Sequence, residues 1–177
     1  MGAANKLLLP VEGVAVVRRV VEAVCTASLD RVVVVVGHEA DEVGHALTGL
    51  AVRLVDNPRY REGLGSSVAA GVAAVGEADG YLICVGDLPR LTASSVKAVL
   101  DRFREADEPG VVVPHCRGRP GHPVGVRSRF RDLLLTLEGD RGARAALRNK
   151  ATVVQLDLDD PGILEDVDTP EDYARYG

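Results

Sequence analysis

Helical and strand patterns alternate along this chain of 177 residues, and that alternation restricts the fold more than any other feature. Residues 12–28 have valines at helical spacing, and residues 31–36 after them form an almost pure β-branched run. Further helices are expected at 39–47, 66–75, 92–106 and 170–176, with two short ones between 126 and 152, and further strands at 51–55, 81–85, 111–113, 123–126 and 152–156. The pattern predicts an α/β fold of βαβ units with right-handed crossovers and a mostly parallel sheet.

Length and charge limit the class of protein further. A chain of this length fits one domain, residues 1–177, because no linker or repeat divides it. The net charge of −5 argues against a nucleic-acid binder or a membrane-surface binder, because both need a cationic surface. No apolar stretch is long enough to span a membrane. We therefore expect a globular protein with no nucleic-acid or membrane partner.

The three cysteines are odd in number and far apart in the sequence, which fits a reducing cytoplasm and no disulfide framework. Cys25 and Cys84 lie among apolar residues and are interpreted as core residues. Cys116 lies in a polar, arginine-containing segment, so we expect it to be exposed. The sequence therefore predicts cytoplasmic localisation.

An aspartate follows the most apolar of the expected strands. Residues 81–85 are followed by Gly86, Asp87 and Pro89. A carboxylate at the carboxyl end of a parallel strand points into the crevice where open α/β sheets bind ligands. A hard oxygen ligand there suits Mg²⁺ on substrate phosphates. The alternative is that Asp87 only caps the following turn.

A second acidic site precedes the last helix. Asp166 and Asp168 are two residues apart on an extended segment, so their side chains are expected to point the same way. A helix begins at Pro170, and Thr169 or Asp168 can cap it. That capping role does not need both aspartates, which suit a metal shared with Asp87.

A glycine loop precedes the helix at 66–75. Asn57 is followed by Gly63, Gly65, Ser66 and Ser67, and free amides at a helix start with small hydroxyl residues can bind an anion or a ribose. The alternative is an ordinary loop in which a serine caps the helix.

Basic residues occur in two loops. Arg117 and Arg119 lie in a turned loop that leads to His122, and with Arg127 and Arg129 they can gather a phosphate. His122 can donate to a substrate oxygen. The competing interpretation is a solvated basic loop.

Two further basic residues have a possible role at phosphates. Arg144 follows a glycine-rich segment, residues 139–142, and is expected to face the cleft unless Asp140 caps the next helix and leaves it in solvent. Lys6 is one of three lysines, and its flexible charge suits a triphosphate.

Several common catalytic motifs are absent from the sequence. It has no nucleophile elbow, no P-loop with Gly-Lys-Ser/Thr and no His-Glu-x-x-His helix. No Gly-x-Gly-x-x-Gly follows a strand. These absences disfavour serine hydrolases, Walker-type NTPases and zinc hydrolases.

Six motifs in order give a family resemblance. They are Met1-Gly2 with Lys6–Pro10, Asn57 with Gly65-Ser66-Ser67, Gly86-Asp87-Leu88-Pro89, Gly121-His122-Pro123, Gly139–Arg144, and Asp166–Asp172. Together they resemble the molybdenum cofactor cytidylyltransferase branch of the MobA-like nucleotidyltransferases. The resemblance implies a Rossmann-like three-layer αβα sandwich of the nucleotide-diphospho-sugar transferase type. It also implies an enzyme that uses Mg²⁺ to move CMP from CTP onto molybdopterin, with release of pyrophosphate.

The resemblance also implies a role for each candidate. Asp87, with Asp168 and Asp166, would hold the metal, and Lys6 would bind the triphosphate, which makes Lys6, Asp87 and Asp168 the catalytic set. The nucleotide would lie against Asn57, Gly65, Ser66 and Ser67, whereas His122 and Arg144 would face the acceptor.

The sequence departs from the family at its start. The family signature Leu-Ala-Ala-Gly-x-Ser-x-Arg precedes the Met-Gly, and the sequence begins at that methionine, without the first strand or its glycine-rich loop. An internal start site, a partial chain or a truncated homologue would each explain this, and a chain that truly lacks the loop is expected to have impaired activity.

Three alternatives stay open: a sugar-phosphate acceptor, an NAD(P)H-dependent oxidoreductase of the nicotine blue type, and a non-catalytic cofactor-binding chaperone for a molybdenum hydroxylase.

Overall fold

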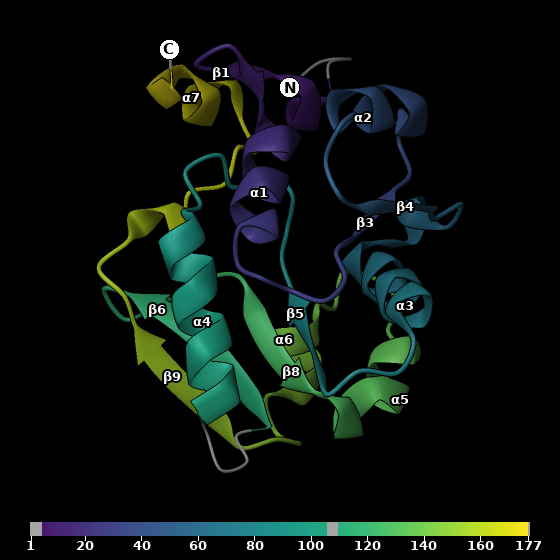
Figure 1. Ribbon diagram of the computed structural model, residues 1–177, viewed down its shortest axis with the longest axis vertical. Helices are drawn as coiled ribbons and strands as arrows, with labels where there is room; N and C mark the ends of the chain where they lie inside the picture. The colour runs from purple at the N-terminus through teal and green to yellow at the C-terminus, as the bar shows by residue number, and fades with distance from the viewer. Residues whose placement is uncertain (1–4, 106–109, 177) are drawn as a thin grey trace.

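The computed structural model describes residues 5–105 and 110–176 of the chain (Figure 1). Its α-helices are α1 (Val16–Cys25), α2 (Ala40–Ala46), α3 (Leu64–Val75), α4 (Ala93–Glu105), α5 (Arg131–Leu135), α6 (Ala143–Leu147) and α7 (Pro170–Tyr173). Its strands are β1 (Pro10–Val11), β2 (Val14–Ala15), β3 (Val33–Val36), β4 (Arg53–Asp56), β5 (Gly80–Ile83), β6 (Val111–Cys116), β7 (Arg119–Pro120), β8 (Val124–Arg127) and β9 (Val153–Asp157). Short 3-10 helices include η1 (Lys6–Leu8), η2 (Tyr60–Glu62) and η4 (Pro161–Ile163).

The strands form the expected α/β arrangement. β3 and β4 are parallel, and so are β6 and β9. β8 lies between β5 and β6 and is antiparallel to both, so β5, β6 and β9 run in one direction. The short loop between β6 and β8 forces this reversal, because parallel neighbours need a long crossover. The predicted α/β fold with a mostly parallel sheet is confirmed.

The described strands form a five-stranded sheet, the two-stranded sheet of β3 and β4, and the β1–β2 hairpin. Among the residues that the structure describes, β3 pairs only with β4, and β5 only with β8. The β3–β4 sheet and the five-stranded sheet are therefore not joined by pairing between described strands.

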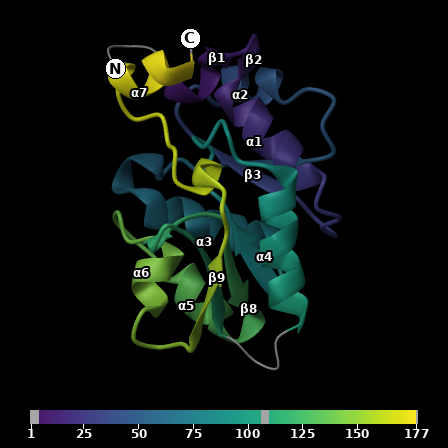
Figure 2. The same cartoon turned by 90° about the vertical axis from the view of Figure 1, so that its left-hand side faces the viewer.

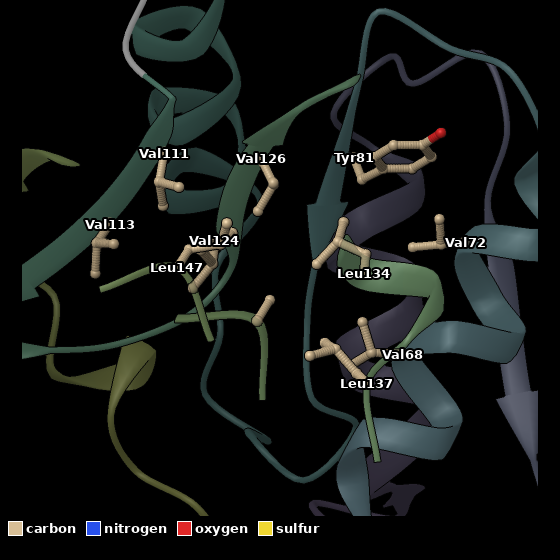
Figure 3. Packing of buried hydrophobic residues seen from close by; sticks show 11 residues of the cluster. Val68, Val72, Tyr81, Val111, Val113, Val124, Val126, Leu134, Leu137 and Leu147 are labelled. Carbon is tan, nitrogen blue, oxygen red and sulfur yellow. The ribbon is translucent and has the colours of Figure 1, made fainter. Parts of the chain in front are cut away.

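The five-stranded sheet is covered on both faces (Figure 2). Val111 and Val113 of β6 pack in a cluster with residues of α3, α5 and α6 (Figure 3). Val112, on the opposite face, packs against Val99 and Phe103 of α4. Because both faces of the strand are buried, its first three residues are all valine and do not alternate between apolar and polar.

The two ends of the described chain lie side by side (Figure 1). Val11 and Val16 pack with Val167, and the Tyr173 hydroxyl donates to the carbonyl of Pro10 at 2.6 Å. This packing brings η1 close to the acidic segment before α7. Residues 1–4, which include the Met1-Gly2 motif, lie outside the described residues.

Two sequence expectations need correction. The first turn of the expected helix 12–28 is instead part of the β1–β2 hairpin, because Glu12 and Gly13 adopt positive φ and reverse the chain. Cys116 is 1% exposed, because it ends β6 inside the core, so the expectation that it is exposed is wrong.

Residue 106, the expected end of the helix at 92–106, lies outside the described residues. Within 5–105 and 110–176, no helix has the length and apolarity needed to cross a membrane.

Candidate active site

Lys6 is held in place by the contacts of its own turn. The Asn5 side chain accepts from the Leu7 amide at 3.1 Å and donates to the His38 carbonyl at 3.4 Å. Leu7 and Leu8 pack against the buried cluster between α1, β3 and α2. The backbone of Lys6 is thus fixed, while its long side chain extends from η1.

The lysine joins two aspartates from distant parts of the chain. Its Nζ lies 2.6 Å from Oδ2 of Asp87 and 2.5 Å from Oδ1 of Asp168. The Val167 amide donates to the Asp87 carbonyl at 3.1 Å, and the Val167 side chain is fully buried. Backbone pairing and side-chain packing therefore hold the segments of Asp87 and Asp168 next to each other. The three residues predicted to be catalytic thus meet at one point.

The charges at this point influence one another. Burial alone would lower the pKa of Lys6, but the hydrogen bonds to Asp168 and Asp87 outweigh it and raise that pKa above its ordinary value. Partial desolvation and then the charges of Asp168 and Asp87 raise the pKa of Asp166, although much of that residue is exposed. Burial of its thiol, with the nearby charge of Asp87, raises the pKa of Cys84 to about 12. Cys84 is therefore a thiol near pH 7 and not a nucleophile.

The donor set suits a magnesium ion shared with a substrate. Oδ1 of Asp87 is buried and has no hydrogen-bond partner. Among the described residues, no group of three or more His, Cys, Asp or Glu side chains can hold a metal, so Asp166 does not complete a three-carboxylate site. Mg²⁺ in phosphate-transferring sites is usually held by one or two carboxylates plus substrate phosphates. Asp87 and Asp168 fit that mode of binding, in which the nucleotide completes the coordination.

His122 lies near this cluster, before β8. Its amide donates to the Ile163 carbonyl at 3.0 Å, and its Nδ1 lies 3.4 Å from the Ile83 carbonyl. Burial lowers the pKa of His122, and the charge of Arg144 lowers it further. The hydrogen bond to the Ile83 carbonyl and the charge of Asp87 raise this pKa but do not outweigh burial. The ring is therefore neutral at pH 7. Since a carbonyl only accepts, Nδ1 is the donor and Nε2 is left as an acceptor, which differs from the expected donation.

Arg144 comes from α6 and contacts the loop that contains His122. Its guanidinium donates to the Pro120 carbonyl at 3.1 Å. α6 begins after Gly142 with no side-chain cap, so Asp140 does not cap it as the alternative interpretation required. Arg144 is exposed and lies close enough to His122 to affect its pKa.

Asn57 and Ser66 stabilise the glycine loop from inside. The Asn57 amide donates to the hydroxyls of Ser66 at 3.0 Å and Ser67 at 3.1 Å. The Ser66 hydroxyl in turn donates to the carbonyls of Arg59 and Gly63. Asn57 and Ser66 are buried, whereas Ser67 is only partly buried. Their predicted nucleotide contacts stay predictions, and the hydrogen bonds present shape the loop.

The glycine loop also contacts the loop before α6. The Gly65 amide donates to the Gly139 carbonyl at 2.8 Å. A Cβ on Gly65 would lie 2.7 Å from the Glu138 backbone nitrogen, and a Cβ on Gly63 would lie 2.4 Å from the Gly139 carbonyl carbon. Only glycine allows these backbones to approach so closely. The glycine loop and the segment before α6 are thus packed directly against each other.

The four arginines expected to gather a phosphate are not brought together. Arg117 lies in the tight turn between β6 and β7, next to Arg119. Arg127 instead pairs in register with Gly80 at the start of β5, the end opposite Asp87, and donates to the Phe103 carbonyl. These arginines are close in the sequence, but the direction of β8 places Arg127 far from the turn that contains Arg117.

No pattern in the sequence indicates the contacts that assemble the site. Lys6 is 81 residues from Asp87 and 162 residues from Asp168. The Asn5–His38 and Val167–Asp87 hydrogen bonds that fix these residues involve backbone atoms. Such contacts leave no side-chain pattern from which to predict them.

Comparisons with known proteins agree with this arrangement. The MobA-like NTP transferase domain family matches residues 1–155. A nicotine blue oxidoreductase from Paenarthrobacter nicotinovorans is 32% identical over 187 aligned positions, which cover 99% of this chain and 89% of that protein. A molybdenum cofactor cytidylyltransferase from Escherichia coli is 27% identical, over 81% of this chain and 72% of that protein. The solved structure of a nucleotidyl transferase from Methanothermobacter is 29% identical with a TM-score of 0.83, over 97% of this chain and 83% of that one.

Proposed function

This chain belongs to the MobA-like NTP transferase domain family and is a nucleotidyltransferase, and from that premise we propose that it transfers CMP from CTP to molybdopterin cofactor, releasing pyrophosphate. Residues 1–177 act as one domain in this proposal. The metal is Mg²⁺, and the acceptor is a phosphate-bearing cofactor. Three unpaired cysteines favour the reducing cytoplasm as the place of action.

The convergence of Asp87, Asp168 and Lys6 is the observation that supports the proposal most strongly. An ammonium within 2.6 Å of each of two carboxylates marks one place where the charges of a cation, a triphosphate and a leaving pyrophosphate can be neutralised. Transfer of a nucleotidyl group needs positioning and charge neutralisation more than a covalent nucleophile. The inert thiol of Cys84 and the absence of a nucleophile motif agree with such chemistry.

The reaction balances with these residues in their proposed roles. An oxygen of the acceptor phosphate attacks the α-phosphorus of CTP, the bond between the α- and β-phosphates breaks, and a new diphosphate linkage forms as pyrophosphate leaves. Asp87 and Asp168 would hold the metal, which when bound neutralises phosphate charge. Lys6 offsets the charge that develops on the leaving pyrophosphate. Arg144 orients the phosphate of the incoming cofactor, and His122 faces the acceptor beside it.

The proposal is tested by measuring pyrophosphate release from each of the four common NTPs, with molybdopterin as acceptor and with or without Mg²⁺. We expect release from CTP that needs both acceptor and metal. The Asp87→Asn variant should lose it, and Asp101→Asn, which removes an exposed carboxylate on α4 paired with Lys97, should keep it. Release that is independent of acceptor would contradict the proposal.

A second candidate function is oxidoreduction, favoured by the likeness to the nicotine blue oxidoreductase over almost the whole chain. Against it, no Gly-x-Gly-x-x-Gly follows a strand in this sequence. Oxidation of NADH or NADPH with a quinone-like dye, measured by absorbance at saturating cofactor, would establish this alternative. A non-catalytic chaperone for a molybdenum hydroxylase is distinguished by Asp87→Ala, which would leave the affinity for that partner unchanged.

A further inference from the structure

Lys6 occupies the position between the two carboxylates that a metal would need. Its Nζ contacts Oδ2 of Asp87 and Oδ1 of Asp168 at hydrogen-bond distance. An ammonium and a metal ion cannot both lie between the same two oxygens at contact distance, because they would overlap and repel each other. The lysine and the metal are therefore alternatives at this point.

The geometry favours a lysine that is able to leave. Lys6 is the most flexible member of the cluster, since four methylene groups separate its ammonium from a fixed backbone. Its side chain is 33% exposed, and that of Asp168 is 59% exposed, so solvent reaches the outer side of the pair. The Asp87 side chain is only 18% exposed and has a buried oxygen without a partner. The lysine thus neutralises the two carboxylates, while Oδ1 of Asp87 stays without a hydrogen-bond partner.

We propose that Lys6 is the resident cation of the resting site, and that a divalent metal binds Asp87 and Asp168 only after the ammonium has left both carboxylates. This inference rests on the proposed function in one respect, since the displaced ammonium then has the triphosphate of the nucleotide as its anionic partner. Without nucleotide, Lys6 competes with the metal and weakens its binding. Reciprocity of linked binding then requires that nucleotide and metal promote each other's binding through this lysine.

The test measures metal binding without nucleotide, on the full chain stripped with EDTA. Mn²⁺ is titrated and its free fraction followed by electron paramagnetic resonance, for the wild type, Lys6→Met and Lys97→Met. Lys97 is the matched control, because it also pairs with an aspartate, Asp101, but on the exposed face of α4. We expect Lys6→Met to bind Mn²⁺ about 10-fold more tightly than the wild type, within the range usual for coupled sites. Lys97→Met should bind as the wild type does.

A second measurement covers the chance that Lys6→Met is unstable without its ion pairs. Adding Mg²⁺ should raise the melting temperature of Lys6→Met, and of the polar variant Lys6→Gln, more than that of the wild type. If neither variant binds Mn²⁺ more tightly than the wild type, and neither gains more from Mg²⁺, the inference is wrong.

Failure of this inference differs from failure of the proposed function. A wild type that transfers CMP in a metal-dependent way, with no gain in metal affinity in either lysine variant, would overturn the inference alone. Tighter metal binding in the lysine variants, with no nucleotidyl transfer by the wild type, would overturn the proposed function alone.

Discussion

Replacing Asp87 by asparagine separates the charge of this residue from its shape. Asparagine has the same size and leaves no cavity, but it removes the negative charge that faces Lys6. An exposed ion pair contributes about 0–1 kcal/mol to stability, whereas breaking a buried one costs about 3–5 kcal/mol. The Asp87 side chain is mostly buried and Lys6 keeps Asp168 as a partner, so we expect a loss between these limits, of about 1–2 kcal/mol. For a chain of this length, that loss lowers the melting temperature by about 2–8 °C.

The effect on activity should be far larger than the effect on stability. Removing one electrostatic contact to a transition state typically lowers turnover by about 100- to 1000-fold. We therefore expect Asp87→Asn to lose about that factor in CMP transfer at a temperature where it is fully folded. Turnover is measured by pyrophosphate release, melting by circular dichroism, and Asp101→Asn is the control for both. Turnover within about threefold of the wild type would refute the assignment of Asp87 to the metal site.

Three further predictions concern the loops around the cluster. Gly65→Ala should lower stability by about 1–3 kcal/mol in chemical denaturation, because its Cβ would meet the Glu138 backbone. Gly44→Ala, inside α2, should be tolerated. Equal losses of stability in the two variants would refute the close approach of the backbones at Gly65 as the cause. Burial lowers the pKa of His122 below the ordinary 6.5, so the folded protein favours the neutral ring and its stability should fall as the pH drops below 6.5. His122→Gln should weaken this pH dependence in melting curves. An unchanged pH profile in that variant would contradict the prediction. Arg144→Gln should raise the KM for the acceptor about 10-fold with little change in the KM for CTP, and the reverse pattern would place this residue at the nucleotide.

The elements of the fold could be predicted from local patterns. The helix over Ala93–Glu105 and the strand over Val33–Val36 lie within the predicted ranges, because their apolar spacing matches one kind of structure. The Thr92 hydroxyl accepts from the Ser95 amide at 3.2 Å and so caps the start of this helix. The hairpin at residues 10–15 was not predicted, because its reversal depends on positive φ at Glu12 as well as at Gly13.

The composition of the site could be predicted, but its assembly could not. Asp87 comes directly after a recognisable strand pattern, and Asp168 comes directly before a recognisable helix start. The family resemblance adds Lys6 to the predicted site. Their mutual contact depends on the pairing of Val167 with Asp87 and on the packing of two chain ends more than 150 residues apart. Long-range contacts of this kind follow from topology and not from local sequence. The burial of Cys116 was missed for the same reason, since a polar neighbourhood in sequence became the end of a core strand.

The fate of each phosphate of CTP distinguishes CMP transfer from every other reaction considered for this protein. CTP labelled at the α-phosphate or at the γ-phosphate is incubated with the protein, Mg²⁺ and molybdopterin, and the products are separated. If the protein transfers CMP, the α-label appears in the acceptor, joined through a new diphosphate linkage, and the γ-label appears in pyrophosphate. An α-label recovered only as free CMP, or left in CTP while NADH or NADPH is oxidised, would contradict that transfer.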